Sequence, residues 1–436
     1  MFTRILIANR GEIAVRVIRA CKEMGIQTVA VYSEADRESL HVALADQAIC
    51  IGPALSRDSY LNMERIVSAA LATKSQAIHP GYGFLSENAE FARLCEEHGI
   101  VFIGPGADII SRMGDKDSAR KLMKANNVPI IPGTDILPDA DAACREAEKM
   151  GYPVILKASA GGGGKGIRIV REPEEMVNAF NTAVTEAKQA FGDGRMYMEK
   201  YLFPAKHIEV QLLADNSGNI VCLGERECSI QKNNQKLVEE SPSPYVDKET
   251  RKKLQQTAAD AARAAGYVNA GTVEFLMDKD RNFYFMEMNT RLQVEHPVSE
   301  LVSGRDIVKW QIRIAAGVDL SFTQDEIRIR GAAIECRINA LGVGNVRFLH
   351  IPSGPWVRFD TALYQGYDVP PYYDSMLGKM IVFSSNREEA LRKMQSALCE
   401  LVIDGIPDNI ESQIEIIRDP EFQKGDYYTD FMSKKR

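Results

Sequence analysis

A short stretch near residue 290 holds several residue types that phosphate chemistry requires. Glu287 and Asn289 stand two positions apart at the end of an apolar run that predicts a strand. Alternate residues of a strand share a face, so Phe285, Glu287 and Asn289 are expected to point the same way. Carboxylate and amide oxygens suit Mg²⁺ that carries substrate phosphates. Arg291 could bind an anion and Glu295 could move a proton, so the stretch predicts a site for phosphate chemistry.

Glu274 could supply a second carboxylate to this site. Two apolar runs flank the polar segment 278–282, which predicts a hairpin. If the turn is centred between Asp280 and Arg281, Glu274 pairs with Glu287, and Leu276 pairs with Phe285. Carboxylates so placed repel each other unless a cation joins them. A solvated surface strand is the alternative, but the paired carboxylates favour a metal site.

A glycine-rich loop follows a predicted buried strand that ends near Lys157. Successive glycines, with Gly163 and Gly164 among them, let backbone N–H groups approach a phosphate without obstruction. Lys157 and Lys165 add positive charge. Gly166 stands where a P-loop requires Ser or Thr, so the motif is not a P-loop. A flexible linker is the alternative to the favoured interpretation, a loop that covers a nucleotide.

Further segments carry polar residues beside predicted strands. The segment from Glu199 to Leu202 follows a strand, where it could hold the edge of an adenine or be plain loop. The polar run 228–236 could meet ribose or phosphates, or be a surface turn. Arg337 is expected to share a strand face with Glu335 and could reach an anion in a neighbouring cleft. An ordinary half-exposed strand is the alternative for this last segment.

About three domains must position these residues, since 436 residues are too many for one ordinary core. Residues 1–112 alternate strands with helices, which predicts a doubly wound α/β domain. Residues 113–329 form a central region with a smaller, mobile α/β segment, the glycine-rich lid, at about 129–203. Residues 330–436 form a C-terminal α+β domain. Helices are expected at 13–24, 116–126, 248–265 and 387–400.

Composition restricts the classes of partner. A net charge of −7 argues against nucleic acid, and no apolar run approaches the roughly 20 residues that span a membrane. The N-terminus lacks the apolar core of a signal peptide. Eight scattered cysteines without a C-x-x-C pair indicate free thiols in a reducing compartment. We therefore expect a cytoplasmic protein that needs neither nucleic acid nor a membrane.

Several motifs together resemble one family closely. Over nearly its whole length the chain is similar to the biotin carboxylases, a branch of the ATP-grasp enzymes. The segments that carry the resemblance are Ile7–Ala14, His79–Asn88, Met113–Lys116, Lys157–Gly166, Arg291–Pro297, Glu335–Asn339 and Pro370–Met376.

The resemblance implies a reaction in two steps. ATP phosphorylates bicarbonate to carboxyphosphate with Mg²⁺ or Mn²⁺, and the CO₂ released carboxylates N1′ of biotin. The chain holds no Ala-Met-Lys-Met biotin-acceptor motif. Biotin is therefore expected on a separate biotin carboxyl carrier protein, with separate carboxyltransferase subunits. The assignment implied is the biotin carboxylase subunit of an acetyl-CoA or related acyl-CoA carboxylase, and a homodimer, since relatives are commonly homodimers.

The resemblance also implies roles for individual residues. Those expected at the nucleotide are Lys116, Lys157, Gly163, Gly164, Glu199, Leu202, His207, Gln231, Asn234 and Leu276. Those expected at the metal are Glu274, Glu287 and Asn289. Those expected to act on bicarbonate and biotin are Lys236, Arg291, Gln293, the Val294 backbone, Glu295 as the base, and Arg337 for the enolate form of biotin.

The sequence departs from the family in two places. Asn234 stands where the family more often has a histidine, so altered ATP affinity is expected. The segment 340–355, which follows Arg337, lacks the usual Ala-Glu and Pro-Ser-Pro-Gly residues. The altered segment leaves a catalytically impaired assembly subunit as one alternative function. Another ATP-grasp carboxylate–amine ligase, which would share the same ATP site, is the second.

Overall fold

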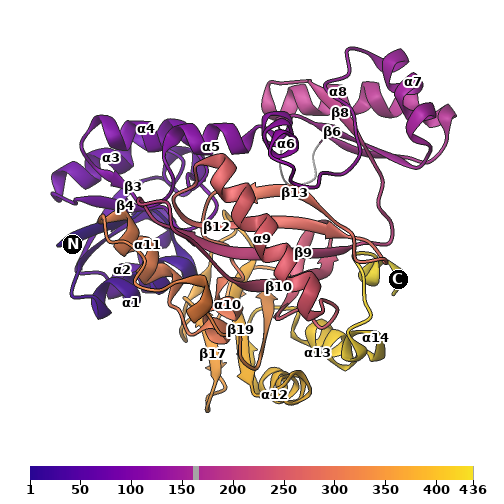
Figure 1. The fold of residues 1–436 in the computed structure, drawn as a ribbon. Helices are drawn as coiled ribbons and strands as arrows, with labels where there is room; N and C mark the ends of the chain where they lie inside the picture. Colours follow the sequence, from indigo (N-terminus) through magenta and orange to yellow (C-terminus); the bar gives the residue numbers. More distant parts are fainter. Residues whose placement is uncertain (161–165, 436) are drawn as a thin grey trace.

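The computed structural model describes residues 1–160 and 166–435 (Figure 1). The N-terminal region contains a parallel sheet in the order β3-β2-β1-β4-β5. Alternate residues of β1 enter different cores. Ile5 and Ile7 pack with helix α1, whereas Leu6 and Ala8 pack with α3 and α4. Helices therefore cover both faces, which confirms the doubly wound fold. The elements are β1 (Arg4–Ile7), α1 (Gly11–Glu23), β2 (Gln27–Ser33), α2 (Leu40–Leu44), β3 (Gln47–Gly52), α3 (Met63–Ala72), β4 (Ala77–His79), α4 (Ala89–Glu97), β5 (Val101–Phe102) and α5 (Ala107–Gly114).

The segment expected to be a lid forms a lobe that projects from the body of the molecule (Figure 1). Its antiparallel sheet has the order β7-β6-β8 and packs against α7 and α8 around its own apolar core. The elements from this lobe and the helix before it are α6 (Lys116–Ala125), α7 (Ala140–Met150), β6 (Val154–Ala158), β7 (Ile167–Val170), α8 (Met176–Phe191) and β8 (Met196–Lys200). Strand β8 includes Glu199, so the prediction that Glu199 lies in a loop after the strand is wrong.

One antiparallel sheet runs through the central and C-terminal regions, in the order β13-β12-β9-β10-β11-β14-β19-β17. The β11–β14 pairing joins the two regions, with Glu239 opposite Glu335. The central and C-terminal parts are therefore coupled rigidly through backbone hydrogen bonds. The central elements are β9 (Lys206–Ala214), β10 (Ile220–Lys232), β11 (Gln235–Ser241), α9 (Lys248–Ala265), β12 (Asn269–Met277), β13 (Phe283–Asn289), α10 (His296–Ser303) and α11 (Ile307–Ala315).

The C-terminal elements cover the far end of this sheet. Helix α12 packs on β14 and β19 through residues such as Ala390 and Met394. The elements are β14 (Ala332–Asn339), β15 (Gly344–Asn345), β16 (Phe348–His350), β17 (Val357–Thr361), β18 (Asp368–Val369), β19 (Met376–Ser384), α12 (Arg387–Glu400), β20 (Val402–Asp404), α13 (Ile410–Arg418), α14 (Pro420–Lys424) and α15 (Phe431–Lys434). Short 3₁₀ helices cover Glu34–Asp36, Ser56–Asp58, Pro173–Glu175 and Gln324–Glu326.

Two bulk expectations can be compared with the structure. All eight cysteines lie in the described part of the chain and are free thiols, as their spacing predicted. Within the same residues, every helix is too short or too polar to cross a bilayer.

Candidate active site

A cleft of about 1640 Å³ opens where the three regions meet. The lid lobe contributes Lys157 and Tyr201, the central sheet His207 and Glu274, and the C-terminal region Arg337. Of the residues expected to act, the following line this cleft: Lys116, Lys157, Leu202, His207, Gln231, Asn234, Lys236, Glu274, Leu276, Glu287, Asn289, Arg291, Gln293, Val294, Glu295 and Arg337. Gly163 and Gly164 lie outside the described residues. The fold thus gathers one cleft from segments far apart in sequence.

The β12–β13 hairpin brings the expected metal residues together. Glu274 pairs with Glu287, which confirms that register, and Asn289 Nδ2 donates to Glu274 Oε1 at 2.8 Å. A register shift follows Glu274, however, and Phe285 pairs with Phe275. The predicted Leu276–Phe285 pairing is therefore wrong. Phe285 is buried in the core, and does not share the cleft face with Glu287, because the bulge at Met286 interrupts the alternation.

The donor set of this hairpin fits a divalent cation. Glu274, Glu287 and Asn289 offer two carboxylates and an amide oxygen, which are the hard ligands that Mg²⁺ prefers. Protein nitrogens contact both carboxylates in the structure. Lys116 Nζ lies 3.3 Å from Glu287 Oε2, and His207 Nε2 lies 2.9 Å from Glu274 Oε2. A bound metal would replace these contacts.

Lys236 joins three carboxylates at the floor of the cleft. Its ammonium lies 2.6 Å from Glu209, 3.0 Å from Glu274 and 2.6 Å from Glu295. Burial lowers the pKa of Lys236, but the three carboxylates outweigh burial and raise it well above its ordinary value. Lys236 therefore stays charged and allows three buried carboxylates to lie close together.

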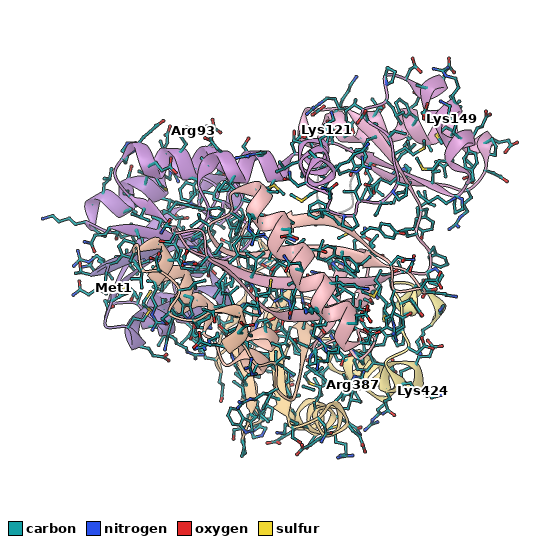
Figure 2. The ribbon with its side chains drawn as sticks, in the orientation of Figure 1. Met1, Arg93, Lys121, Lys149, Arg387 and Lys424 are labelled. Atoms are coloured by element: carbon teal, nitrogen blue, oxygen red, sulfur yellow. The ribbon has the colours of Figure 1, made fainter. Side chains whose placement is uncertain are left out.

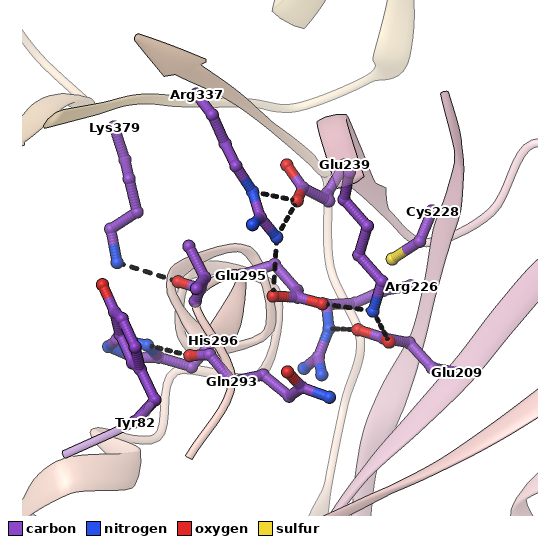
Figure 3. Close-up of polar contacts among 12 residues, drawn as sticks. Tyr82, Glu209, Arg226, Cys228, Glu239, Gln293, Glu295, His296, Arg337 and Lys379 are labelled. Atoms are coloured by element: carbon purple, nitrogen blue, oxygen red, sulfur yellow. Dashed lines mark hydrogen bonds and ion pairs between the residues drawn. The ribbon is translucent and has the colours of Figure 1, made fainter. Parts of the chain in front are cut away.

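Lys236 contacts one carboxylate oxygen of Glu295, Oε1, and Arg337 contacts the other, Oε2 (Figure 3). The Arg337 guanidinium donates to Glu295 Oε2 at 3.0 Å and to Glu239 Oε1 at 2.6 Å. Burial raises the pKa of Glu295, but Lys236 and Arg337 outweigh burial and hold the pKa well below its ordinary value. Glu295 is therefore ionised at neutral pH, which is the form that accepts a proton.

Arg291 lines the same cleft as Glu295. Its guanidinium donates to Glu87 Oε2 at 2.7 Å, Gln293 Oε1 at 2.8 Å and Asn289 Oδ1 at 3.2 Å. Gln293 in turn donates to Glu274 Oε1 at 3.1 Å. This network fixes a guanidinium and an amide beside the Glu295 carboxylate, an arrangement that suits a small planar oxyanion.

The lid residues expected at a nucleotide lie in one charged cluster. Lys157 Nζ donates to Glu199 Oε2 at 2.5 Å, and Arg120 Nε lies 3.0 Å from Glu199 Oε1. Glu199 is only 3% exposed, so its carboxylate serves these two cations. Leu202 lies in the loop between β8 and β9, where apolar side chains line the cleft. In the central sheet, Gln231 on β10 places its Nε2 atom 2.7 Å from Nδ1 of His207 on β9.

The two departures from the family have local structural explanations. Asn233 and Asn234 have φ of +53° and +63° and form the tight turn between β10 and β11. Asparagine tolerates this left-handed backbone better than most residues, which accounts for the Asn-Asn pair.

The segment 340–355 turns away from Arg337. Leu341 N donates to Pro407 O, and, among the described residues, the lining of the cleft has no member from 340–355.

Sequence reasoning did not assign several residues that hold the site. Glu209 on β9 faces Lys236 on β11 across the intervening strand β10, and Glu239 faces Arg337 from the neighbouring strand. Glu87 reaches Arg291 from the N-terminal region. Lys379 Nζ donates to Val294 O at 2.8 Å (Figure 3). The alternation of Glu209 with His207 on one strand gave a signal for the first. The others depend on contacts between segments far apart in sequence.

The burial of Glu12 is expected to make the stability of the protein depend on pH. Glu12 is buried beside Lys379, and burial raises the pKa of Glu12 from 4.5 to about 7 against the opposing charge of Lys379. The folded state therefore retains a proton that the unfolded state releases. The resulting stabilisation is complete below pH 4.5 and is lost as the pH rises through about 7.

Glu12→Gln mimics the protonated form and removes this dependence. Between pH 4.5 and 8, the free energy of unfolding of the wild type is expected to fall relative to Glu12→Gln by on the order of 3 kcal/mol. Denaturant unfolding at both pH values measures the difference. If the free energies of unfolding of the wild type and Glu12→Gln differ by the same amount at both pH values, that result would contradict a raised pKa of Glu12.

The fold and the cleft together define an ATP-grasp enzyme. The family described as "Biotin carboxylase, N-terminal domain" matches residues 1–110, "Carbamoyl-phosphate synthase L chain, ATP binding domain" matches 115–323, and "Biotin carboxylase C-terminal domain" matches 335–434. The chain belongs to the biotin carboxylase family.

Relatives resemble the chain over its full length. "Biotin carboxylase 1" of Bacillus subtilis is 52% identical, across 99% of this chain and 98% of the relative. The "2-oxoglutarate carboxylase small subunit" of Hydrogenobacter thermophilus is 50% identical, across 100% of this chain and 94% of the relative. These matches agree with the family resemblance of the sequence motifs.

Solved structures agree with the fold. A biotin carboxylase from Campylobacter jejuni, solved in a complex named for β,γ-ATP, has a TM-score of 0.98 at 48% identity, covering 100% of this chain and 99% of that one. The biotin carboxylase domain dimer of the Hydrogenobacter thermophilus 2-oxoglutarate carboxylase has a TM-score of 0.96 at 50% identity, covering 100% and 98%. Its title records MgADP, ADP and bicarbonate.

Proposed function

We propose that this chain catalyses the ATP- and bicarbonate-dependent carboxylation of biotin on a separate carrier protein. The observation that carries the proposal is the Glu295 carboxylate, held between Lys236 and Arg337 and facing the Arg291 and Gln293 side chains. A base, two cations and an oxyanion pocket thus lie beside the residues suited to phosphates. This arrangement distinguishes bicarbonate activation from ATP binding alone.

In the first step, an oxygen of bicarbonate attacks the γ-phosphorus of ATP, and the bond to ADP breaks. Arg291, Gln293 and the Val294 backbone hold bicarbonate, and Glu295 accepts its proton. Lys116 and Lys157 bind the phosphates, with His207, Gln231 and Asn234 along the nucleotide. Glu199, Leu202 and Leu276 border the adenine. Phosphoryl transfer depends mainly on such positioning and on charge neutralisation.

Glu274, Glu287 and Asn289 would hold Mg²⁺ or Mn²⁺. When bound, the metal neutralises phosphate charge and keeps the reacting oxygens aligned. In the second step, carboxyphosphate breaks into CO₂ and phosphate, and the released phosphate takes the proton from N1′ of biotin. N1′ then bonds to CO₂, while Arg337 stabilises the enolate form of the biotin ureido group. Arg337 keeps its partners Glu239 and Glu295 despite the altered segment 340–355. This intact arrangement argues against a degenerate assembly subunit.

We further propose the domain boundaries 1–112, 113–329 and 330–436, the middle one being the ATP-grasp domain. The extents of the family matches support these boundaries. Biotin would arrive on a biotin carboxyl carrier protein, and separate carboxyltransferase subunits would select an acyl-CoA, such as acetyl-CoA, as acceptor. The dimer title of the Hydrogenobacter relative supports a homodimer. The free thiols support a reducing compartment such as the cytoplasm.

The direct test measures ADP release from ATP with bicarbonate, with and without free biotin. We expect bicarbonate-dependent ATP hydrolysis that biotin stimulates, together with ¹⁴C-bicarbonate incorporation into biotin. Turnover that ignores biotin but responds to an amine acceptor would instead indicate an ATP-grasp carboxylate–amine ligase. ATP binding without turnover under any of these conditions would favour the assembly subunit.

A further inference from the structure

Lys206 is a buried cation without a part in the chemistry proposed above. It begins strand β9 and its side chain is fully buried. The rings of three tyrosines surround its ammonium, with centroids at 4.6 Å for Tyr245, 4.5 Å for Tyr427 and 4.9 Å for Tyr428. We call these three rings the tyrosine cage. Aromatic faces attract a cation most strongly where water is excluded.

The Lys206 ammonium also binds the backbone of the C-terminal segment, residues 422–433. It donates to the carbonyl oxygens of Tyr427 and, at 3.4 Å, Gly425, and it lies 3.7 Å from Glu227 Oε2. A buried ammonium is costly unless such partners satisfy it. Because two cage rings and both carbonyls belong to the C-terminal segment, Lys206 is satisfied only when that segment is seated on the central sheet.

A second cation anchors the start of the same segment. Arg387 donates to the carbonyl oxygens of Phe422, at 2.7 Å, and Gln423, at 2.6 Å. Arg387 and Lys424 are labelled beside the C-terminal helices in Figure 2. Arg387 thus fixes the start of the segment, while Lys206 fixes the part that leads to Thr429 at the cleft.

Beyond the tyrosine cage the C-terminal segment enters the cleft. Thr429 N donates to Ala205 O at 2.9 Å, and Thr429, Asp430 and Met432 line the cleft. Ala205 ends the loop that carries Leu202, and both residues line the cleft. The segment therefore forms a wall at the apolar end of the cleft, where the adenine is expected.

We propose that Lys206 is a positioning residue for the nucleotide: through the tyrosine cage it holds the C-terminal segment as one wall of the adenine end. The inference rests on the proposed function for the location of adenine. Lys206 acts only through the segment, since its ammonium is enclosed and does not reach the cleft. Its loss is therefore expected to weaken ATP binding while leaving the bicarbonate pocket, which lies around Arg291, unchanged.

The test compares Lys206→Met with Lys206→Arg and with the exposed control Lys424→Met. For Lys206→Met we expect the KM for ATP and the Kd for MgADP to rise about tenfold, with kcat and the KM for bicarbonate within twofold of wild type. Lys206→Arg keeps a cation in the cage and is expected to restore most of the affinity. Lys424→Met removes a charge from the same segment outside the cage and is expected to match wild type.

A purely structural role predicts a different pattern. If Lys206→Met only reduces the fraction of enzyme molecules that are folded and active, the apparent kcat falls and the KM for ATP is unchanged. That result would overturn the proposal. If Lys206→Met does not fold, Tyr428→Leu removes one ring and is expected to raise the Kd for MgADP about threefold; an unchanged Kd would overturn the proposal. Calorimetric titration with MgADP needs no turnover. Failure of the carboxylation assay would therefore refute the proposed function separately from this inference.

Discussion

Glu295→Gln is expected to lower biotin-dependent ADP release by a factor of about 10²–10⁴, the usual contribution of a general base. Glutamine keeps the shape of the side chain but cannot accept the bicarbonate proton. It also leaves Lys236 and Arg337 without the carboxylate that they share. The residues proposed to bind ATP lie elsewhere in the cleft, so the Kd for MgADP is expected to stay within about threefold of wild type.

Glu239→Gln is the matched control for this change. It removes the other buried carboxylate that contacts Arg337 and leaves Glu295 in place. We expect a loss of turnover of no more than about tenfold. If Glu295→Gln loses no more than Glu239→Gln, the base is another group. If Glu295→Gln also loses MgADP binding, the substitution has disrupted the cleft as a whole.

Lys236→Met is expected to have the second large effect, on activity and on stability together. The substitution leaves Glu209, Glu274 and Glu295 without their common cation. Breaking a buried ion pair by removing one partner costs about 3–5 kcal/mol. The pKa of Glu295 rises in the variant, so part of the base is protonated at neutral pH and turnover is expected to fall at least a hundredfold.

The pH dependence of this loss has a definite sign. In the variant the carboxylates take up protons in the folded state, since protonation relieves their repulsion. The deficit in the free energy of unfolding is therefore expected to be smaller at pH 5.5 than at pH 8. Lys236→Arg keeps the charge and is expected to recover stability but not full turnover, because a planar guanidinium cannot reproduce the three contacts of an ammonium. A deficit independent of pH would contradict the electrostatic explanation.

Local patterns predicted much of the secondary structure. The helices expected at 248–265 and 387–400 occur with those bounds as α9 and α12. The hairpin register at Glu274 and Glu287 is also confirmed. These features depend on periodicity, capping and turn residues, all of which act over a few neighbouring positions. A bulge is different, because it follows from how β13 must fit its surroundings, and so simple strand alternation predicts the wrong face for Phe285.

The partners of the site residues required the tertiary structure. The sequence does not indicate that Glu199 lies within a strand and that its carboxylate contacts both Lys157 and Arg120. Nor does it indicate that the C-terminal segment closes one end of the cleft around Lys206. Both depend on contacts between residues distant along the chain, whose geometry no local pattern encodes.

The sequence by itself determined the chemistry available to this protein: its family, its element order, and the acids, bases and cations at fixed spacings on predicted strands. Only the tertiary structure decided which charge faces which. Burial places Lys236 among three carboxylates and Arg337 against Glu295. The physical reason is that side-chain type and local spacing are properties of the chain, whereas pKa and partner choice are properties of the low-dielectric space that distant segments enclose.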